Sequence, residues 1–240
     1  GRFWKTVSEH PALRKVTHGP RLGELAGLIF AEPAHAHDYL FLRPAPVGNA
    51  TNLHYDYPFF AGGAKSIVTC WAPLGEIPVG DGPLVVVEGS NRFDALIARY
   101  RGVDVDRDGL PGSFPMDAIA FAKSHKTRLL TSDFRAGDVL LFDMFTLHGS
   151  CDNCLPGGTV RLSCDVRWQA AEDARDERAG VDQRVVRRAR VGDEVEQRPH
   201  GPVALDARDG HDGGARQRVQ QLAIRARLVL ALAQLDGQQV

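Results

Sequence analysis

The stretch "LHYDYPFF" (53–60) places two metal-capable side chains, His54 and Asp56, inside an apolar and aromatic run. Residues two positions apart in a β-strand point to the same face of the sheet. An extended conformation here therefore brings the imidazole and the carboxylate together and turns Tyr55 the other way. An imidazole and a carboxylate that converge in this way are suited to binding a metal ion.

A third ligand is expected from a distant strand, and His148 is the best candidate. It follows the apolar run "LFDMFTL" and precedes a Gly-Ser turn, as expected for a residue at the rim of a β-barrel. Two histidines and one carboxylate form the facial triad that holds non-haem Fe(II) and leaves the remaining coordination positions open. We therefore predict His54, Asp56 and His148 as the metal ligands and the catalytic centre.

A candidate cation follows the third ligand. Arg161 begins an expected strand shortly after His148. An arginine in this position can bind a carboxylate of a cosubstrate through two parallel hydrogen bonds. The alternative is an arginine on the surface of an edge strand.

The first part of the chain predicts many short strands and few helices. Turns that contain Gly, Pro and Asp separate the strand-like runs. Strands are expected at 38–43, 51–57, 66–74, 83–90, 126–132, 137–144, 145–150 and 159–169, and helices at 21–30 and 91–100. Because the strands do not alternate regularly with helices, a doubly wound sheet is not expected. The predicted fold class is mainly β, as a sandwich or barrel.

Residues 169–240 differ sharply from residues 1–168 in composition. They contain no Phe, Tyr, Trp, Cys, Met, Lys, Ser, Thr or Asn, all of which occur in the first region. A core normally needs aromatic side chains, and caps and turns need Ser, Thr and Asn. We interpret 1–168 as one domain and 169–240 as an atypical Ala/Arg/Asp-rich tail. Two explanations of the tail stand side by side, an out-of-frame segment and a disordered, partly helical one.

Length and charge limit the classes of function. A chain of 240 residues with 43% hydrophobic content can form one sizeable core, and its net charge of −1 argues against a nucleic-acid or membrane-surface partner. No apolar run approaches the roughly 20 residues of a membrane helix, and no signal-peptide pattern is present. A cytoplasmic protein is expected. The chain opens at Gly1, so we expect its domain to be N-terminally incomplete.

Three other clusters are weaker candidates for chemistry. "AHAHD" (34–38) holds two histidines and an aspartate but has no distant third partner, so a polar loop is favoured. Cys151 and Cys154 lack the second Cys/His pair that a structural zinc site needs. "DVDRDG" (104–109) is similar to a calcium-binding loop but lacks the glutamate that should follow it. With four cysteines in the chain, a disulfide scaffold is not expected.

Two long stretches resemble the phytanoyl-CoA dioxygenase family of Fe(II)/2-oxoglutarate oxygenases. They are "TNLHYDYPFF…SIVTCWAPLGEIPVGDGPLVVVEGSNR" and "FRAGDVLLFDMFTLHGSCDN…VRLSCDVRWQ". The resemblance covers roughly residues 38 to 169. It combines H-x-D, W-x-P-L-G, G-x-L-x-V-x-x-G-S, G-D-x-L-x-F, H-G-S and a last strand with an arginine. These motifs in this order are far more specific than any one of them.

The resemblance implies a double-stranded β-helix, that is, a cupin-like jelly roll with flanking helices. It implies that the predicted triad binds Fe(II) and that Arg161 pairs with the distal carboxylate of 2-oxoglutarate. In relatives this arginine can lie closer to the last histidine, so Thr159 is an alternative position, with Arg167 as a reserve on the same strand face. Trp71, Ser150 and Tyr55 match positions that line the cosubstrate pocket in relatives. Thr51 is predicted to join them, because it lies on the face shared with the neighbours of His54.

The implied activity is that of a 2-oxoglutarate-dependent dioxygenase that hydroxylates a small organic substrate with O2 and releases succinate and CO2. The carboxylate of Asp56 favours hydroxylation, because halogenases related to this family carry a small residue at that position. Two alternatives stay open: a cupin-like metal enzyme that does not use 2-oxoglutarate, and an inactive binding relative. The sequence specifies neither the substrate nor the oligomeric state.

Overall fold

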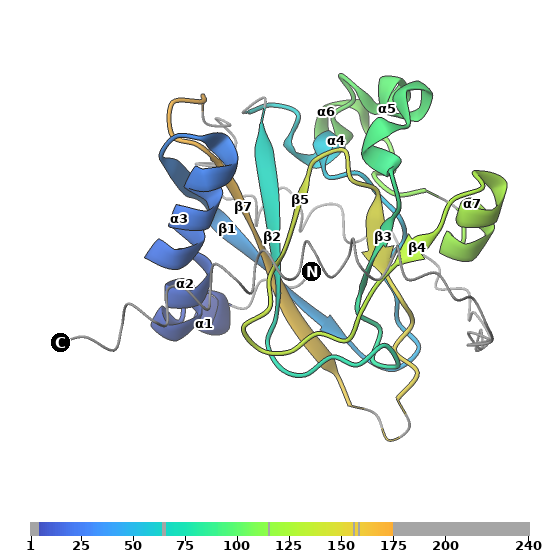
Figure 1. Ribbon diagram of the computed structural model, residues 1–240, viewed down its shortest axis with the longest axis horizontal. Helices are drawn as coiled ribbons and strands as arrows, with labels where there is room; N and C mark the ends of the chain where they lie inside the picture. The colour runs from blue at the N-terminus through green and yellow to red at the C-terminus, as the bar shows by residue number, and fades with distance from the viewer. Residues whose placement is uncertain (1–4, 64–65, 115, 156, 158, 175–240) are drawn as a thin grey trace.

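Two antiparallel sheets face each other and form the body of the molecule (Figure 1). The computed structural model describes residues 5–63, 66–114, 116–155, 157 and 159–174. The four-stranded sheet has the strand order β1 (Ala34–Ala45), β7 (Arg161–Ala170), β2 (Ile67–Pro73) and β5 (Leu140–Asp143). The three-stranded sheet has the order β4 (Leu129–Leu130), β3 (Leu84–Val87) and β6 (His148–Ser150).

The chain passes back and forth between these two sheets. Strands β1 and β2 lie in the four-stranded sheet, β3 and β4 in the three-stranded sheet, and β5, β6 and β7 alternate between them. His54, between β1 and β2, adds a bridge to β6. All the named strand pairs are antiparallel. This is the topology of a double-stranded β-helix, and it confirms the predicted fold class.

Strand β7 lies inside the four-stranded sheet, and its two faces differ. One face carries Leu162, Cys164, Val166 and Trp168, which pack with helix α3 in an apolar cluster. The other face carries five buried polar side chains: Arg161, Ser163, Asp165, Arg167 and Gln169. The two-residue period of the strand therefore places a polar stripe between the sheets, where a sandwich normally has an apolar core.

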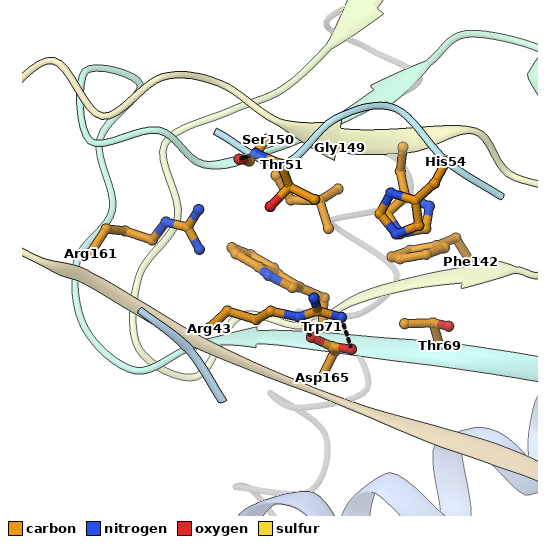
Figure 2. Close-up of a pocket in the computed structure, with 12 residues that line it drawn as sticks. Arg43, Thr51, His54, Thr69, Trp71, Phe142, Gly149, Ser150, Arg161 and Asp165 are labelled. Atoms are coloured by element: carbon orange, nitrogen blue, oxygen red, sulfur yellow. Dashed lines mark hydrogen bonds and ion pairs between the residues drawn. The ribbon is translucent and has the colours of Figure 1, made fainter. Parts of the chain in front are cut away.

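The polar inner face continues on the neighbouring strand β2. In the register of β2 against β7, Thr69 lies opposite Arg167 and Trp71 lies opposite Asp165. Residues opposed in this way hold their side chains next to each other. Figure 2 shows Thr69, Trp71 and Asp165 together along the wall of a pocket. The strand register thus decides which polar side chains meet.

Helices cover both sides of the jelly roll (Figure 1). On the side of the four-stranded sheet lie α1 (Lys5–Ser8), α2 (Pro11–Thr17) and α3 (Pro20–Phe30). The remaining helices are α4 (Tyr57–Phe60), η1 (Ser90–Arg92), α5 (Asp94–Tyr100), α6 (Val105–Asp108) and α7 (Ala118–Ser124). Ile97 of α5 and Phe121 of α7 pack with Val87 and Leu147 in a second apolar cluster. The insertion between β3 and β4 therefore covers the three-stranded sheet.

The segment 51–57 differs from the predicted strand. A bridge at His54 and a backbone hydrogen bond from Ser150 to Thr51 pair this segment with β6, and no strand runs through it. Asp56 has helical backbone angles (φ −72°, ψ −26°) and directly precedes α4. Pro58 explains the turn, because its fixed φ suits the first turn of a helix. The prediction of a regular strand through Asp56 was therefore wrong.

The last strand continues to Ala170, beyond the predicted domain boundary at residue 168. Residues 175–240, which make up most of the predicted tail, lie outside the described residues. Within the described ranges, no helix is both long enough and apolar enough to span a membrane. The cytoplasmic localisation stays a prediction. All four cysteines are free.

Gly149 follows His148 and lies against the segment that carries His54. A Cβ atom added at Gly149 would lie 2.5 Å from the backbone oxygen of Thr51, so the two segments would have to separate. We expect Gly149→Ala to lower the free energy of unfolding by about 1–3 kcal/mol, which is typical of an overpacked site. Gly75→Ala is the matched control, because nothing lies within 4 Å of its added Cβ. Urea unfolding compares the two variants, and equal stabilities would contradict this close packing.

Candidate metal centre

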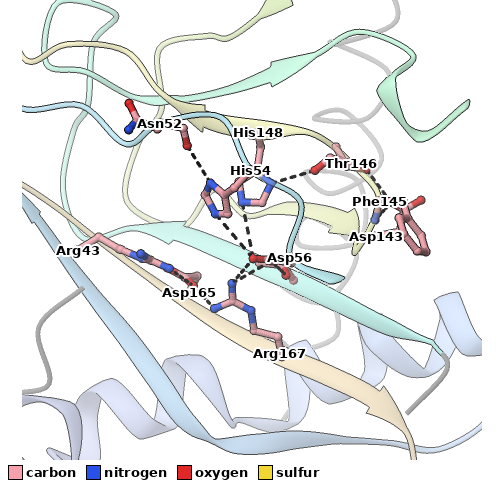
Figure 3. A network of polar contacts seen from close by, with 11 residues as sticks. Arg43, Asn52, His54, Asp56, Asp143, Phe145, Thr146, His148, Asp165 and Arg167 are labelled. Carbon is pink, nitrogen blue, oxygen red and sulfur yellow. Dashed lines mark hydrogen bonds and ion pairs between the residues drawn. The ribbon is translucent and has the colours of Figure 1, made fainter. Parts of the chain in front are cut away.

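Three side chains from two distant segments of the chain direct their ligand atoms at one point (Figure 3). The ligand atoms of His54, Asp56 and His148 all lie within 4.8 Å of one another. The Nε2 atoms of the two histidines lie 3.8 Å and 4.0 Å from Oδ1 of Asp56. Cis donors with metal–ligand bonds of about 2 Å lie roughly 3 Å apart, so the three side chains would move about 1 Å closer together around an ion. Among the described residues, this is the only group of three or more His, Cys, Asp or Glu side chains with such geometry.

Backbone pairing brings the two histidines side by side. His54 and His148 exchange backbone hydrogen bonds in both directions, at 2.9 Å and 3.1 Å. A directly opposed antiparallel pair of this kind places its side chains next to each other. The two ring centroids lie 4.3 Å apart. The convergence therefore arises from β-pairing between segments that are distant in sequence.

A backbone carbonyl orients each histidine ring. Nδ1 of His54 lies 2.9 Å from the backbone oxygen of Asn52, and Nδ1 of His148 lies 2.9 Å from that of Thr146. A carbonyl oxygen only accepts hydrogen bonds, so Nδ1 carries the proton and Nε2 presents its lone pair towards Asp56. Metal-binding histidines are typically oriented in this way.

Burial and nearby charges set the protonation states of the three side chains. Burial lowers the pKa of His54 to about 3, with a further contribution from His148, and burial also lowers the pKa of His148. Burial alone would raise the pKa of Asp56. Arg167, the two histidines and a hydrogen bond from Thr69 outweigh this effect and hold the pKa well below its usual range. Near neutral pH the site therefore offers two neutral imidazoles and one carboxylate to a divalent metal.

A pocket opens beside the two histidines (Figure 2). Its wall includes four of the residues predicted to bind the cosubstrate: Thr51, Trp71, Ser150 and Arg161. These residues come from the segment before His54 and from β2, β6 and β7. The fold thus gathers positions from across the chain around one cavity next to the metal ligands.

Arg161 is buried at the pocket wall, with only 6% of its surface exposed. Its Nη1 donates to Oγ of Ser163 at 2.8 Å, whereas its buried Nε has no hydrogen-bond partner in the part of the chain that the structure describes. Burial and the charge of Arg43 lower its pKa to about 10, so Arg161 stays protonated near neutral pH. A buried guanidinium with an unused donor is suited to binding a carboxylate.

Three other predicted or alternative cosubstrate residues lie away from this pocket. Tyr55 is fully buried in the apolar cluster of the three-stranded sheet, and its hydroxyl donates to the backbone oxygen of Ser90 at 3.2 Å. Thr159 is exposed ahead of β7. Arg167 donates a hydrogen bond to Asp56 and forms an ion pair with Asp165. Of the three candidates for the carboxylate-binding position, Arg161 is the one that lines the pocket.

Three polar residues of the site were not predicted as site residues. Thr69 donates its hydroxyl hydrogen to Oδ2 of Asp56 at 2.5 Å. Arg43 donates two hydrogen bonds to Asp165, at 2.7 Å and 3.1 Å. The signal that could have found Thr69 and Arg43 is a polar side chain in an apolar strand, as in "SIVTCWAPL" and "DYLFLR".

The competing clusters do not form metal sites in the described part of the chain. The "AHAHD" run begins β1 and is not the predicted loop, and Nε2 of His37 there lies 2.7 Å from Oε1 of Gln169. The "DVDRDG" run forms α6, whose N-terminus Asp104 caps by accepting two backbone hydrogen bonds. Burial raises the pKa of Cys151 to about 11, and Cys154 is exposed.

Comparison with known proteins relates this geometry to one family. The family model for phytanoyl-CoA dioxygenase (PhyH) matches residues 5–154. Two curated proteins named 1-deoxypentalenic acid 11-beta-hydroxylase are similar. The one from Streptomyces arenae is 33% identical over 132 residues, which are 52% of this chain and 43% of the relative. The one from Streptomyces exfoliatus is 31% identical over 160 residues, which are 61% of this chain and 53% of the relative. The chain thus spans about half the length of these relatives.

Solved structures share the fold. The apoform of EctD from S. alaskensis matches with a TM-score of 0.53 at 21% identity, over 74% of this chain and 59% of that chain. The non-heme alpha ketoglutarate dependent epimerase SnoN from nogalamycin biosynthesis matches with a TM-score of 0.50 at 20% identity, over 82% of this chain and 71% of that chain. These likenesses support the assignment of a jelly-roll fold.

The neutral, buried histidines make the metal-free chain sensitive to acid. The folded-state pKa values of His54 and His148 lie below the usual 6.5. As the pH falls below 6.5, the unfolded chain therefore binds protons that the folded site does not bind. The free energy of unfolding is expected to decrease from pH 7 to pH 5 by roughly 2 kcal/mol for each histidine that stays neutral.

Urea unfolding of the metal-free chain at pH 7 and pH 5 measures this effect. His54→Gln is expected to lose part of the pH dependence. His10→Asn is the control, because His10 is exposed and asparagine also caps the N-terminus of α2. A pH dependence in His54→Gln as large as that of the wild type would contradict a neutral imidazole at this position.

Proposed function

Because the chain belongs to the phytanoyl-CoA dioxygenase family, we propose that it is an Fe(II)- and 2-oxoglutarate-dependent oxygenase that hydroxylates a small organic substrate and releases succinate and CO2. The observation that carries this proposal is the buried Arg161 in the same pocket as His54 and His148. A triad of metal ligands fits several kinds of cupin-like enzyme. A buried cation beside the triad fits a cosubstrate with a carboxylate.

The triad would hold Fe(II) through Nε2 of His54, Oδ1 of Asp56 and Nε2 of His148. These donors fit the ion, because the two ring lone pairs and the carboxylate are directed at one point. When bound, the iron supplies the oxidative chemistry with O2 and 2-oxoglutarate, which the side chains alone do not provide. The chain itself holds the donor atoms in place and keeps them in the required protonation states.

We assign the distal carboxylate of 2-oxoglutarate to Arg161, whose Nε has no hydrogen-bond partner among the described residues. Ser150 is placed to assist. Its Oγ accepts a hydrogen bond from the backbone N–H of Thr51 at 2.7 Å, so its own hydroxyl hydrogen is free to point at the carboxylate. Trp71 donates from Nε1 to Oγ of Ser163 at 3.1 Å, and this contact fixes the indole as an apolar wall.

Aromatic side chains shield the metal ligands from water. The ring of Phe142 lies 4.4 Å from that of His148, and the ring of Phe59 lies 5.9 Å from that of His54. Phe59 belongs to α4 and does not line the pocket of Arg161. We assign the approach of the organic substrate to the Phe59 side. The relatives named as hydroxylases of 1-deoxypentalenic acid support hydroxylation as the reaction.

Formation of the iron–cosubstrate complex tests this function without knowledge of the substrate. Anaerobic addition of Fe(II) and then 2-oxoglutarate should produce a visible metal-to-ligand charge-transfer band that requires both additions. His54→Ala and Asp56→Ala should each abolish the band, because each removes a ligand, while the exposed-site variant His10→Asn should retain it. A folded wild-type chain without the band would contradict the proposal. It would favour a cupin-like enzyme of another kind or an inactive relative.

Replacement of Arg161 tests the cosubstrate assignment separately. Arg161→Gln should weaken 2-oxoglutarate binding by about a hundredfold, because loss of a buried charged partner costs about 3 kcal/mol. Its Fe(II) affinity should remain that of the wild type. Arg128→Gln is the control, since Arg128 forms an exposed ion pair with Glu88 at 2.6 Å. Unchanged 2-oxoglutarate affinity in Arg161→Gln, measured by calorimetry, would contradict the assignment.

A further inference from the structure

A chain of alternating charges runs from the candidate metal centre to the pocket wall (Figure 3). Asp56 pairs with Arg167, Arg167 pairs with Asp165, and Asp165 pairs with Arg43. Arg43 and Asp165 line the pocket that contains Arg161. The two guanidiniums and two carboxylates of the chain cancel one another. The interior therefore connects a metal ligand to the cosubstrate pocket without adding net charge.

The two oxygens of Asp56 have different surroundings. Oδ1 faces the Nε2 atoms of His54 and His148 at 3.8 Å and 4.0 Å. Oδ2 accepts a hydrogen bond from the hydroxyl of Thr69 at 2.5 Å. Nη2 of Arg167 donates to both oxygens, at 2.9 Å to Oδ1 and 2.8 Å to Oδ2. Oδ1 is thus directed at the metal position, while two protein donors hold Oδ2.

Arg167 is itself fixed by its neighbours. It is 2% exposed, and its guanidinium carbon lies 4.9 Å and 4.8 Å from the ring centroids of Phe41 and Phe60. Its Nη1 donates to Asp165. The register of β7 against β2 places it opposite Thr69. Separating this buried guanidinium from its partners would leave uncompensated charges in the interior, which is strongly unfavourable. The guanidinium of Arg167 is therefore held beside the carboxylates of Asp56 and Asp165.

Asp165 joins the two arginines of the chain. Its Oδ1 accepts from Nε of Arg43 at 2.7 Å, and its Oδ2 accepts from Nη2 of Arg43 at 3.1 Å and from Arg167. An unpaired carboxylate at this wall would repel a dicarboxylate cosubstrate. Arg43 and Arg167 neutralise the charge of Asp165. Asp165 therefore affects the pocket by holding these arginines in place.

We propose that Arg167 and Thr69 are positioning residues that hold Asp56 as a metal ligand through one oxygen, and that Asp165 and Arg43 tie this ligand to the wall of the cosubstrate pocket. The inference rests on the proposed function, because it requires a metal ion at the triad. Arg167 and Thr69 act through Asp56 and not on the reacting groups. Hydrogen-bond partners of metal ligands typically contribute a factor of roughly 10 to 100 in metal affinity.

Thr69→Val is the most conservative test, because it removes the hydroxyl with little change in shape. Thr17→Val is the matched control: both threonines are 1% exposed, and the hydroxyl of Thr17 donates within α2 to the backbone oxygen of Leu13 at 3.0 Å. Titration of the full, metal-free chain with Co(II), followed by visible absorption, reports metal affinity and coordination geometry without any turnover. Thr69→Val should bind Co(II) about tenfold more weakly than the wild type. Its spectrum should change because Oδ2 of Asp56 loses one of its two donors, whereas Thr17→Val should match the wild type.

Two further variants test the rest of the charge chain. Arg167→Lys keeps the charge but lacks the planar fork that contacts Asp56 and Asp165 together, so Co(II) binding should weaken by roughly tenfold to a hundredfold. Asp165→Asn removes the carboxylate that Arg43 and Arg167 share, so Arg167 is less firmly held and Co(II) binding should weaken.

The outcomes separate this inference from the proposed function. If the wild type binds Co(II) and 2-oxoglutarate, while Thr69→Val and Arg167→Lys keep its Co(II) affinity and spectrum, the positioning role alone is overturned. A lower unfolding midpoint with unchanged Co(II) affinity also overturns it, because it shows a purely structural role. A folded wild-type chain that binds no Co(II) overturns both proposals. If Arg167→Lys does not fold, Thr69→Val decides the question by itself.

Discussion

The interior of this jelly roll depends on one constraint, that charges buried between its two sheets must be paired. Every second residue of β7, from Arg161 to Gln169, has a buried polar side chain on the inner face. A sandwich normally buries apolar side chains at such positions. Arg167 satisfies the constraint through Asp56 and Asp165. Since Asp56 is also a ligand of the candidate metal centre, the contacts that make a polar interior stable are the same contacts that fix the metal-binding carboxylate.

Two arginines on the same face of β7 are suited to different roles because their neighbours differ. Arg167 lies among two carboxylates and two aromatic rings, so its charge is fully used within the chain. Arg161 lies at the pocket wall, where the hydroxyl of Ser163 is its hydrogen-bond partner. Among the described residues, Nε of both arginines lacks a hydrogen-bond partner, so the carboxylates around Arg167 make the difference. The first is therefore suited to holding a ligand of the metal, and the second to receiving an anion from solution. The proposed oxygenase requires both functions, and one strand supplies them.

The candidate metal ligands are brought together by backbone contacts. His54 and His148 form an antiparallel pair, and close packing at Gly149 lets their segments approach. The backbone then turns into α4 immediately after Asp56, which directs the carboxylate back towards the two rings. Backbone carbonyls next to each histidine select the ring nitrogen that faces the metal. The site is thus assembled from main-chain geometry first and side-chain chemistry second.

The sequence by itself determined the fold class, the three ligands that converge in the structure and the strand that carries Arg161. Side-chain periodicity along a strand is local, and it indicated the β-rich fold class and the strand of Arg161. The order of the motifs, typical of one family, identified the three converging side chains although no regular strand runs through Asp56. Only the tertiary structure decided which of Thr159, Arg161 and Arg167 lines the pocket, and that Tyr55 is buried elsewhere. The contacts of Arg43 and Thr69 were likewise hidden in the sequence. The physical reason is strand register: it determines which residues of distant segments are opposed, and no pattern within one segment specifies the register of another.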